Sequence, residues 1–169
     1  MMRHVLPRSI AALLLGLVLL AACLPEPRPR VDVRLLGGEI TSADLAAHDP
    51  TDVEGLVLGE VLLTDDEIMG YDRDEHAILV TSEAWERLQV MRVPVNGVPF
   101  AVCLEGEAIY AGCLWTPVSS LSYDGVTLLL PITGEQGRLP IELGYPGSDF
   151  FGWDDPRDDA GLIAALSDR

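Results

Sequence analysis

Cys23 is the residue whose neighbours in the sequence point most directly to a chemical reaction of its side chain. It follows Leu20-Ala21-Ala22, and secretory leaders end in small residues of this kind before the cleavage site. Two arginines lie among the first nine residues, and residues 10–20 form an uncharged apolar stretch. That stretch is too short to cross a bilayer as a mature helix, which needs about 20 residues. The pattern therefore predicts a signal peptide, residues 1–22.

The run that ends at Cys23 resembles the lipobox of bacterial lipoproteins. The resemblance implies cleavage before Cys23, a diacylglyceryl thioether on its sulfur and a fatty acyl chain on the new amino terminus. Two or more such chains anchor a protein stably, and no other cofactor is expected. We expect an extracytoplasmic envelope protein, in the outer membrane if the cell has one and otherwise on the outer face of the plasma membrane. The alternative is an ordinary secretory signal or an uncleaved anchor in which the cysteine is incidental.

The mature chain combines a stiff tether with one acidic domain. Prolines alternate with other residues over 23–30, which favours an extended tether. The remaining residues, 31–169, suffice for one domain with a hydrophobic core. Removal of the leader takes away two of the 11 basic residues and none of the 27 acidic ones, so the formal charge becomes −18. This charge opposes binding to nucleic acid or to an anionic lipid surface.

Three polar clusters contain residue types suited to chemistry but lack the spacing that chemistry needs. The carboxylates near the C-terminus do not follow the pattern of a calcium loop, and one histidine beside acidic residues is too few ligands for zinc. The serines do not lie in a nucleophile-elbow motif. We predict no catalytic and no metal-binding residues among these clusters, which comprise Asp154, Asp155, Asp158, Asp159, Asp72, Asp74, Glu75, His76, Ser119, Ser120 and Ser122.

The densest aromatic stretch lies near the C-terminus and contains the candidate binding residues Phe150, Phe151 and Trp153. Aromatic side chains dominate interface energies, so an exposed set on a loop would grip a partner protein or peptide. The alternative, which we favour, is that these side chains lock the last helix onto the sheet, because large aromatic residues are usually well buried.

The order of elements predicts an α+β fold. Hydrophobic patterning favours strands at 31–36, 56–63, 76–81, 100–104, 108–112, 126–133 and 139–143. Helices are expected after the capping residues Thr41, Thr81 and Asp158, with a short turn or helix after Thr64. The polar segment 71–75 is expected to form a turn. We therefore expect a small antiparallel or mixed sheet with two or three helices packed on one face.

Cys103 and Cys113 lie in a predicted hairpin whose turn is Glu105-Gly106. A disulfide is the default expectation in an oxidising compartment. A two-residue turn, however, places Cys103 opposite Ala108 and Cys113 opposite Val98, roughly 16 Å apart along the ladder. A bridge needs Cα atoms within about 7 Å of each other. We therefore predict two separate, largely buried thiols.

Three segments resemble the periplasmic head domain of SecD, a subunit of the bacterial protein-export translocase. They are the strand and turn VLGEVLLTDDEI (57–68), the strand that runs into a helix, HAILVTSEA (76–84), and the hairpin GVPFAVCLEGEAIYA (97–111). The resemblance covers about residues 31–133 and leaves the aromatic and acidic tail, 144–169, without a counterpart. It implies an α+β domain with an antiparallel sheet and a role in contacting polypeptide rather than in catalysis.

These observations predict a non-catalytic binding domain that contacts exported polypeptide or another envelope protein. An exposed strand edge can pair with an extended peptide by β-addition, and the hairpin is where we expect such pairing. Two alternatives stay open. One is an extracytoplasmic hydrolase that uses dispersed carboxylates, and the other is a structural module whose aromatic tail docks to an envelope complex.

The predicted lipid anchor can be tested by intact-mass analysis of protein purified from its own envelope. We expect a chain that begins at Cys23 and carries the added mass of a diacylglyceryl group and an acyl chain. A chain with residue 23 unmodified, or with the leader still attached, would contradict the prediction.

Overall fold

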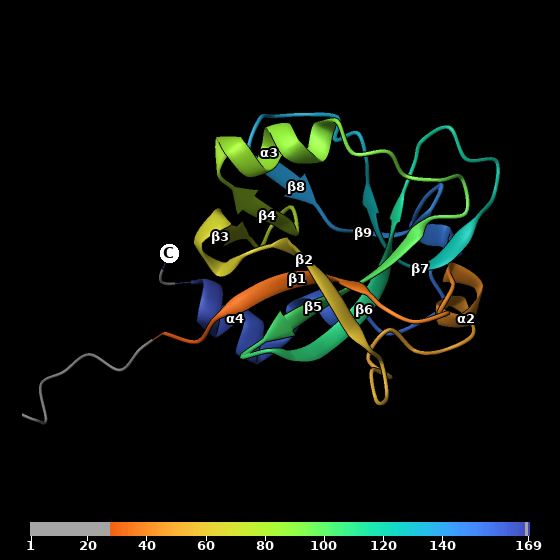
Figure 1. Cartoon of the computed structure of the whole chain (residues 1–169), viewed down its shortest axis with the longest axis horizontal. Helices are drawn as coiled ribbons and strands as arrows, with labels where there is room; N and C mark the ends of the chain where they lie inside the picture. Colours follow the sequence, from red (N-terminus) through yellow and green to blue (C-terminus); the bar gives the residue numbers. More distant parts are fainter. Residues whose placement is uncertain (1–27, 168) are drawn as a thin grey trace, which may run out of the picture.

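Two β-sheets share the main hydrophobic core (Figure 1). The computed structural model describes residues 28–167 and 169, so the predicted leader and Cys23 lie outside the described residues. The larger sheet has six strands in the order β2 (Leu58–Leu63), β1 (Val31–Leu36), β5 (Val98–Leu104), β6 (Glu107–Trp115), β7 (Tyr123–Leu129) and β9 (Glu142–Tyr145). The smaller sheet has three strands in the order β3 (Ile68–Asp72), β4 (Ala77–Val80) and β8 (Arg138–Pro140). Neighbouring strands are antiparallel, except that β6 and β7 are parallel.

Short helices connect the strands, and each begins where the sequence supplies a cap. Thr41 caps α2 (Ser42–Ala46) in a capping box with Asp44, and Thr81 caps α3 (Ser82–Gln89), both as predicted. Asp159 caps α4 (Ala160–Leu166), one residue later than predicted. Single 3₁₀ turns lie at η1 (Asp65–Glu67), η2 (Ser148–Phe150) and η3 (Pro156–Asp158). Among the described residues, no helix has the length and apolar character needed to span a membrane.

The α-helices lie on both faces of the larger sheet. Tyr110 and Leu114 of β6 project into the main core, to which α4 also contributes. Cys113 and Trp115 alternate with them and belong to a smaller cluster, against which Leu45 of α2 packs. The predicted α+β class is confirmed, with a mixed sheet and three α-helices. The helices differ from the expected placement on one face, because the strands of the larger sheet bury side chains on both sides.

The segment 138–145 crosses from one sheet to the other. Residues 138–140 pair with β4, and residues 142–145 belong to β9, which pairs with β7. Between them, the buried Ile141 donates its amide to the carbonyl of His76. The sequence predicted a single strand at 139–143, because one apolar run does not reveal that its two ends serve different sheets.

Several further element boundaries differ from the predictions. β5 and β6, for example, cover residues 98–104 and 107–115 rather than 100–104 and 108–112. Strand β3 extends to Asp72, where the sequence predicted a polar turn from residue 71. Tyr71 pairs with Ile78 of β4 and packs against the main core. Burial of its ring therefore favours the strand more than its polar neighbours favour a turn. The strand predicted at 126–133 runs from residue 123 to residue 129 instead.

The hairpin of β5 and β6 has the predicted two-residue turn. Glu105 and Gly106 both have positive φ, 54° and 83°, which is the backbone of a type I′ turn. Turns of this type match the right-handed twist of the strands that they join. Cys103 lies opposite Ala108, as predicted.

Cys113 lies one residue from its predicted position in the ladder. The register shifts between Val102 and Cys103, so Cys113 faces Pro99 rather than Val98. Both thiols nevertheless remain buried and free, which confirms the prediction that they do not pair.

Gly112 marks a close approach of β6 and β7. A Cβ atom at this position would overlap the backbone carbonyl oxygen of Val126. We expect Gly112→Ala to lower the free energy of unfolding by about 1–3 kcal/mol, as overpacking of other cores does. Gly152→Ala is the control, because a Cβ atom there meets open space. Urea denaturation followed by circular dichroism measures the free energy of unfolding of both variants. Equal values would show that β6 and β7 can move apart at this position without loss of stability.

Candidate functional site

An open cleft of about 360 Å³ lies where the described chain enters the larger sheet. Its lining comes from β1, from β2 and the η1 turn, and from the turn between β5 and β6. Charged side chains of both signs predominate. We call it the β1 cleft, and its residues are Arg30, Asp32, Arg34, Val61, Thr64, Asp65, Glu105 and Gly106.

Alternation along β1 sends charged side chains to one face of the sheet. Val31 and Val33 belong to the main core, so Asp32 and Arg34 project the other way, into the cleft. Their partners on β5 are a cysteine and an alanine, whose small side chains leave space above the strands. Residues 30–34 thus place two cations and one anion on the same face.

Asp32 has an unmet capacity to accept hydrogen bonds. Its Oδ2 atom accepts a hydrogen bond of 2.8 Å from Nε of Arg34. Its Oδ1 atom is buried and has no hydrogen-bond partner among residues 28–167 and 169. The thiol of Cys103 lies nearby, and its burial, followed by the charge of Asp32, raises the pKa of Cys103 to about 11. Because a thiol is a weak donor, the Oδ1 atom still lacks a strong one.

Arg30 differs from most arginines of this chain in its surroundings. Its backbone amide donates to the carboxylate of Glu105, and its carbonyl accepts from the Glu105 amide. Its guanidinium, like that of Arg92, has no acidic partner within the described part of the chain. The arginines that do pair with carboxylates are Arg28, Arg34, Arg73, Arg87, Arg138, Arg157 and Arg169.

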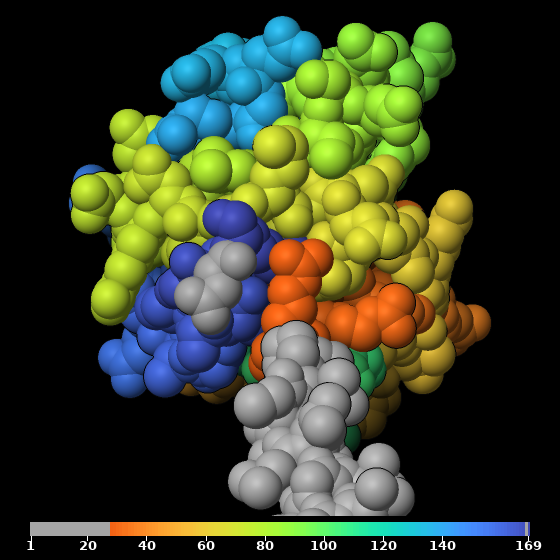
Figure 2. All heavy atoms as spheres, turned by 90° about the vertical axis from the view of Figure 1, so that its left-hand side faces the viewer, coloured from red at the N-terminus to blue at the C-terminus, as the bar shows by residue number. Residues whose placement is uncertain are grey.

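Asp65 ties together segments that are far apart in the sequence, in a group of contacts that we call the Asp65 clasp. Its carboxylate accepts hydrogen bonds from the amide of Val31, at 2.8 Å, and from Arg28, at 3.3 Å, and it pairs with Arg169. Arg169 also donates to the carbonyls of Asp65 and Ile68, and its side chain is only 1% exposed. Figure 2 shows the first described residues between the C-terminal segment and the segment that contains Asp65.

The candidate aromatic residues do not share one environment. Phe151 packs against the main core, whereas Phe150 and Trp153 are 48% and 36% exposed. The η2 turn, which contains Phe150, packs against β9, the last strand of the larger sheet. The segment therefore covers a sheet edge, and the packing role that we favoured from the sequence suits Phe151 best.

The predicted place for peptide addition is wrong, because the hairpin has no free edge. β5 pairs with β1 and β6 pairs with β7, so both strands lie inside the larger sheet. The outer strands of that sheet are β2 and β9. β2 contains two register irregularities, and Arg87 donates to the carbonyl of Leu62. Irregular and capped edges resist pairing with another strand.

The smaller sheet protects its edges in a similar way. On β3, the carbonyl of Ile68 accepts a hydrogen bond from Arg169. β8 has three residues and ends at Pro140, which has no amide hydrogen to donate. The outer strands of both sheets are therefore poorly suited to pairing with an added strand.

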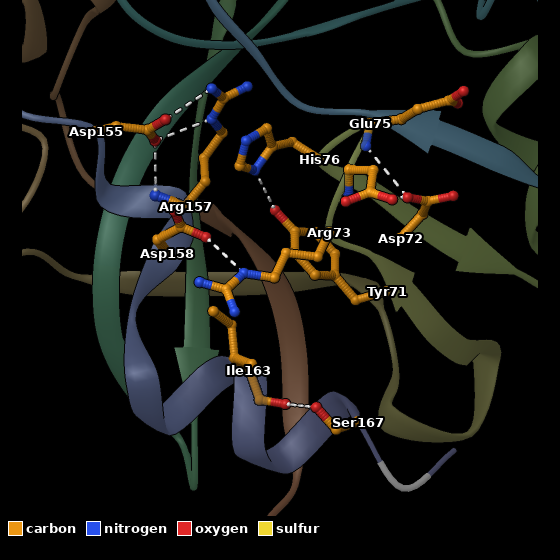
Figure 3. A network of polar contacts seen from close by, with 11 residues as sticks. Tyr71, Asp72, Arg73, Glu75, His76, Asp155, Arg157, Asp158, Ile163 and Ser167 are labelled. Carbon is orange, nitrogen blue, oxygen red and sulfur yellow. Dashed lines mark hydrogen bonds and ion pairs between the residues drawn. The ribbon is translucent and has the colours of Figure 1, made fainter.

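A second polar cluster joins the β3–β4 turn to the η3 turn (Figure 3). The hydroxyl of Tyr71 lies 3.1 Å from Nδ1 of His76, and burial raises the pKa of Tyr71 to about 12. Asp155 pairs with Arg157, which also donates to the backbone carbonyl of Ile141. The Arg157–Ile141 contact and the pair of Arg73 with Asp158 fasten the η3 turn beside the smaller sheet, and the cavity next to Tyr71 and Arg157 measures only about 10 Å³.

Arginine side chains pair with four of the seven carboxylates that the sequence suggested as alternative metal ligands, one of which is Asp155. Asp72 and Glu75 both pair with Arg138, and Asp158 pairs with Arg73. Over the described ranges, no three potential ligands converge as a metal site requires.

Cys113 and Ser119 also carry nucleophilic groups, but the contacts of both side chains are those of structural residues. Burial raises the pKa of Cys113 to about 12, so its thiolate is not populated at neutral pH. Ser119 donates a hydrogen bond of 2.6 Å to the carbonyl of Val95 and thereby joins two loops.

Comparison of the chain with protein-family models, with curated proteins and with solved structures gives no match. The resemblance to the SecD head domain therefore stays a prediction. The sequence did not single out the β1 cleft, and its one signal was the alternation of charged and apolar residues over 30–34. Such alternation usually indicates a solvated face, and only the fold brings Thr64, Asp65 and Glu105 to it.

Replacement of Asp65 by asparagine removes the negative charge from the clasp. Burial opposes ionisation of Asp65, but the amide of Val31 and the guanidinium of Arg169 outweigh it, so the pKa of Asp65 is lowered. We expect Asp65→Asn to lower the free energy of unfolding at pH 7 by about 3 kcal/mol, because Arg169 loses its buried counter-charge.

The loss should depend on pH. A carboxylate with a lowered pKa stabilises the fold above its unfolded pKa, and this contribution disappears as the pH falls through the folded pKa. The difference between wild type and Asp65→Asn should therefore shrink below about pH 4. Asp66→Asn is the matched control, because Asp66 is an exposed neighbour outside the cleft. Denaturation curves at several pH values measure the effect, and a difference that stays constant with pH would argue against a role for the charge.

Proposed function

We propose that this chain is a bacterial envelope lipoprotein, anchored through lipid on Cys23, whose domain binds polypeptide without catalysis. The observation that carries the proposal is the β1 cleft, which opens beside the first described residues and presents both signs of charge. Arg28 and Arg30 contact the domain, so residues 23–27, when extended, would reach roughly 15 Å and would hold the cleft near the membrane surface. That position suits contact with exported polypeptide or with a neighbouring envelope protein.

The charge distribution supports a protein partner. The formal charge of −18, reached when the leader removes two of the 11 basic residues and none of the 27 acidic ones, opposes binding to nucleic acid. A cleft of mixed sign complements a polypeptide, which carries both kinds of side chain. Because the outer strands are irregular, short or covered, we propose recognition through side chains in the cleft rather than through β-addition.

The carboxylates of the cleft support binding rather than proton transfer. Asp32 is paired with Arg34, and Asp65 is paired with Arg28 and Arg169. The lowered pKa of Asp65 keeps it ionised at neutral pH, whereas a general acid of a hydrolase needs a raised pKa.

Photo-crosslinking in the native envelope tests the proposal. A photoreactive phenylalanine analogue is placed at Thr64, an exposed residue of the cleft, or at Glu86, an exposed residue of α3 outside it. We expect the Thr64 probe to give adducts that mass spectrometry identifies as exported chains or envelope proteins, and the Glu86 probe to give few. A lack of protein adducts at Thr64, or turnover of a glycan or peptide by the purified chain, would contradict the proposal.

A further inference from the structure

We infer that Asn96 is a site of spontaneous deamidation, and that the folded domain slows the reaction by fixing the peptide unit that must react. Asn96 is the only asparagine in the sequence, and Gly97 follows it. Glycine has no side chain, which leaves its amide nitrogen unhindered and its backbone free to bend. The inference concerns a chemical modification of the chain and is independent of the proposed function.

Deamidation of this pair is an intramolecular acyl transfer. The amide nitrogen of Gly97 loses its proton and attacks the side-chain carbonyl carbon of Asn96, a carbon–nitrogen bond forms, and ammonia leaves. Water then opens the resulting cyclic imide at either of its two carbonyls. One opening gives aspartate, and the other gives isoaspartate, in which the main chain is longer by one carbon. The reaction needs only water, but the nitrogen and the carbon must first meet in the correct orientation.

The fold holds both ends of the peptide unit between Asn96 and Gly97. The Gly97 amide donates a hydrogen bond of 2.9 Å to the carbonyl of Pro94, and the Asn96 carbonyl accepts one of 2.6 Å from Oγ of Ser42. Because a peptide unit is planar, its nitrogen cannot turn toward the Asn96 side chain unless both hydrogen bonds break. The bond to Pro94 also retains the proton that the nitrogen must lose.

Neighbouring residues restrict the turn further. A Cβ atom on Gly97 would lie 2.5 Å from the ring of the buried Trp115, so Gly97 rests directly against that ring. The loop before β5 lies beside the loop before β7 (Figure 1), and Ser119 donates a hydrogen bond to the carbonyl of Val95. The reaction therefore requires local opening of the loop. Its rate in the folded domain is the rate in the open loop multiplied by the fraction of molecules in which the loop is open.

The modification adds charge to a part of the chain that has none. Asn96 is exposed, and residues 93–104 and 108–123 contain no charged residue. Val95 and Val118, which belong to these segments, are also exposed. Aspartate at position 96 places a carboxylate in this apolar loop, and isoaspartate also lengthens the loop, which then no longer fits the core beneath it.

Mass spectrometry of the full chain during incubation in mildly alkaline buffer tests the inference. Conversion of the amide to an acid raises the mass of the peptide that contains residue 96, and fragmentation distinguishes aspartate from isoaspartate. One sample is kept folded, and a second is unfolded in guanidinium chloride. We expect the unfolded chain to react at least about tenfold faster, because its loop is always open. Equal rates in the two samples, or an unfolded chain in which residue 96 does not react, would overturn the inference.

Variants locate the site and its protection. We expect Ser42→Ala to raise the rate in the folded chain about fivefold, the effect of losing one ordinary hydrogen bond, and to leave the rate in guanidinium chloride unchanged. Ser82→Ala is the matched control, because Ser82 is an exposed serine of α3, and it should react like the wild type in both states. Asn96→Gln keeps an uncharged amide but requires a larger ring, so it should show no gain of mass over the same period. A gain that persists at the wild-type rate in Asn96→Gln would assign the reaction to another residue and overturn the inference.

Hydrogen exchange keeps the test valid if Ser42→Ala does not fold, which circular dichroism checks. The Gly97 amide exchanges its proton through the same opening that frees its nitrogen for attack. In the wild-type chain we expect folding to slow this exchange at least about tenfold, as it slows deamidation. A Gly97 amide that exchanges as fast in the folded chain as in the unfolded chain would contradict the inference, because the turn would then give no protection.

Discussion

The Asp65 clasp is the interaction on which the arrangement of this domain depends. A buried ion pair stabilises a fold only when hydrogen bonds satisfy both partners, and here the carboxylate also binds the Val31 amide while Arg169 also binds two backbone carbonyls. The clasp joins the beginning of β1, the turn that precedes β3, and the C-terminal residue. It therefore sets where the chain enters the larger sheet. Because Asp65 also lines the β1 cleft, one carboxylate serves both the fold and the candidate site.

The sheet edges are protected, whereas the β1 cleft is open. Each outer strand is irregular, short or covered, through Arg87 on β2, the η2 turn on β9, Arg169 on β3 and Pro140 on β8. Such devices oppose pairing with other chains through backbone hydrogen bonds. The β1 cleft, by contrast, is open and lined largely by charged residues.

Local signals in the sequence predicted most of the elements. Thr41 and Thr81 begin helices because a hydroxyl at the cap satisfies amides that the helix leaves open, which is a property of a few neighbouring residues. The Glu105-Gly106 turn was predictable for the same reason. The bulge beside Cys103 was not, since it depends on how β5 fits both of its neighbours, and it moved Cys113 by one residue in the ladder. The division of residues 138–145 between two sheets could not be predicted from the sequence either.

The sequence by itself determined the α+β class, the caps, the hairpin turn, the separate thiols and the acidic charge, because each follows from residues close in the chain or from composition. Only the tertiary structure decided that there are two sheets, that the hairpin is enclosed on both sides, and that Asp65 meets Arg169. It also decided which charges stay unpaired in the cleft. These features depend on contacts between residues separated by tens of positions. The sequence near a charged residue does not show whether the fold will place an oppositely charged side chain beside it.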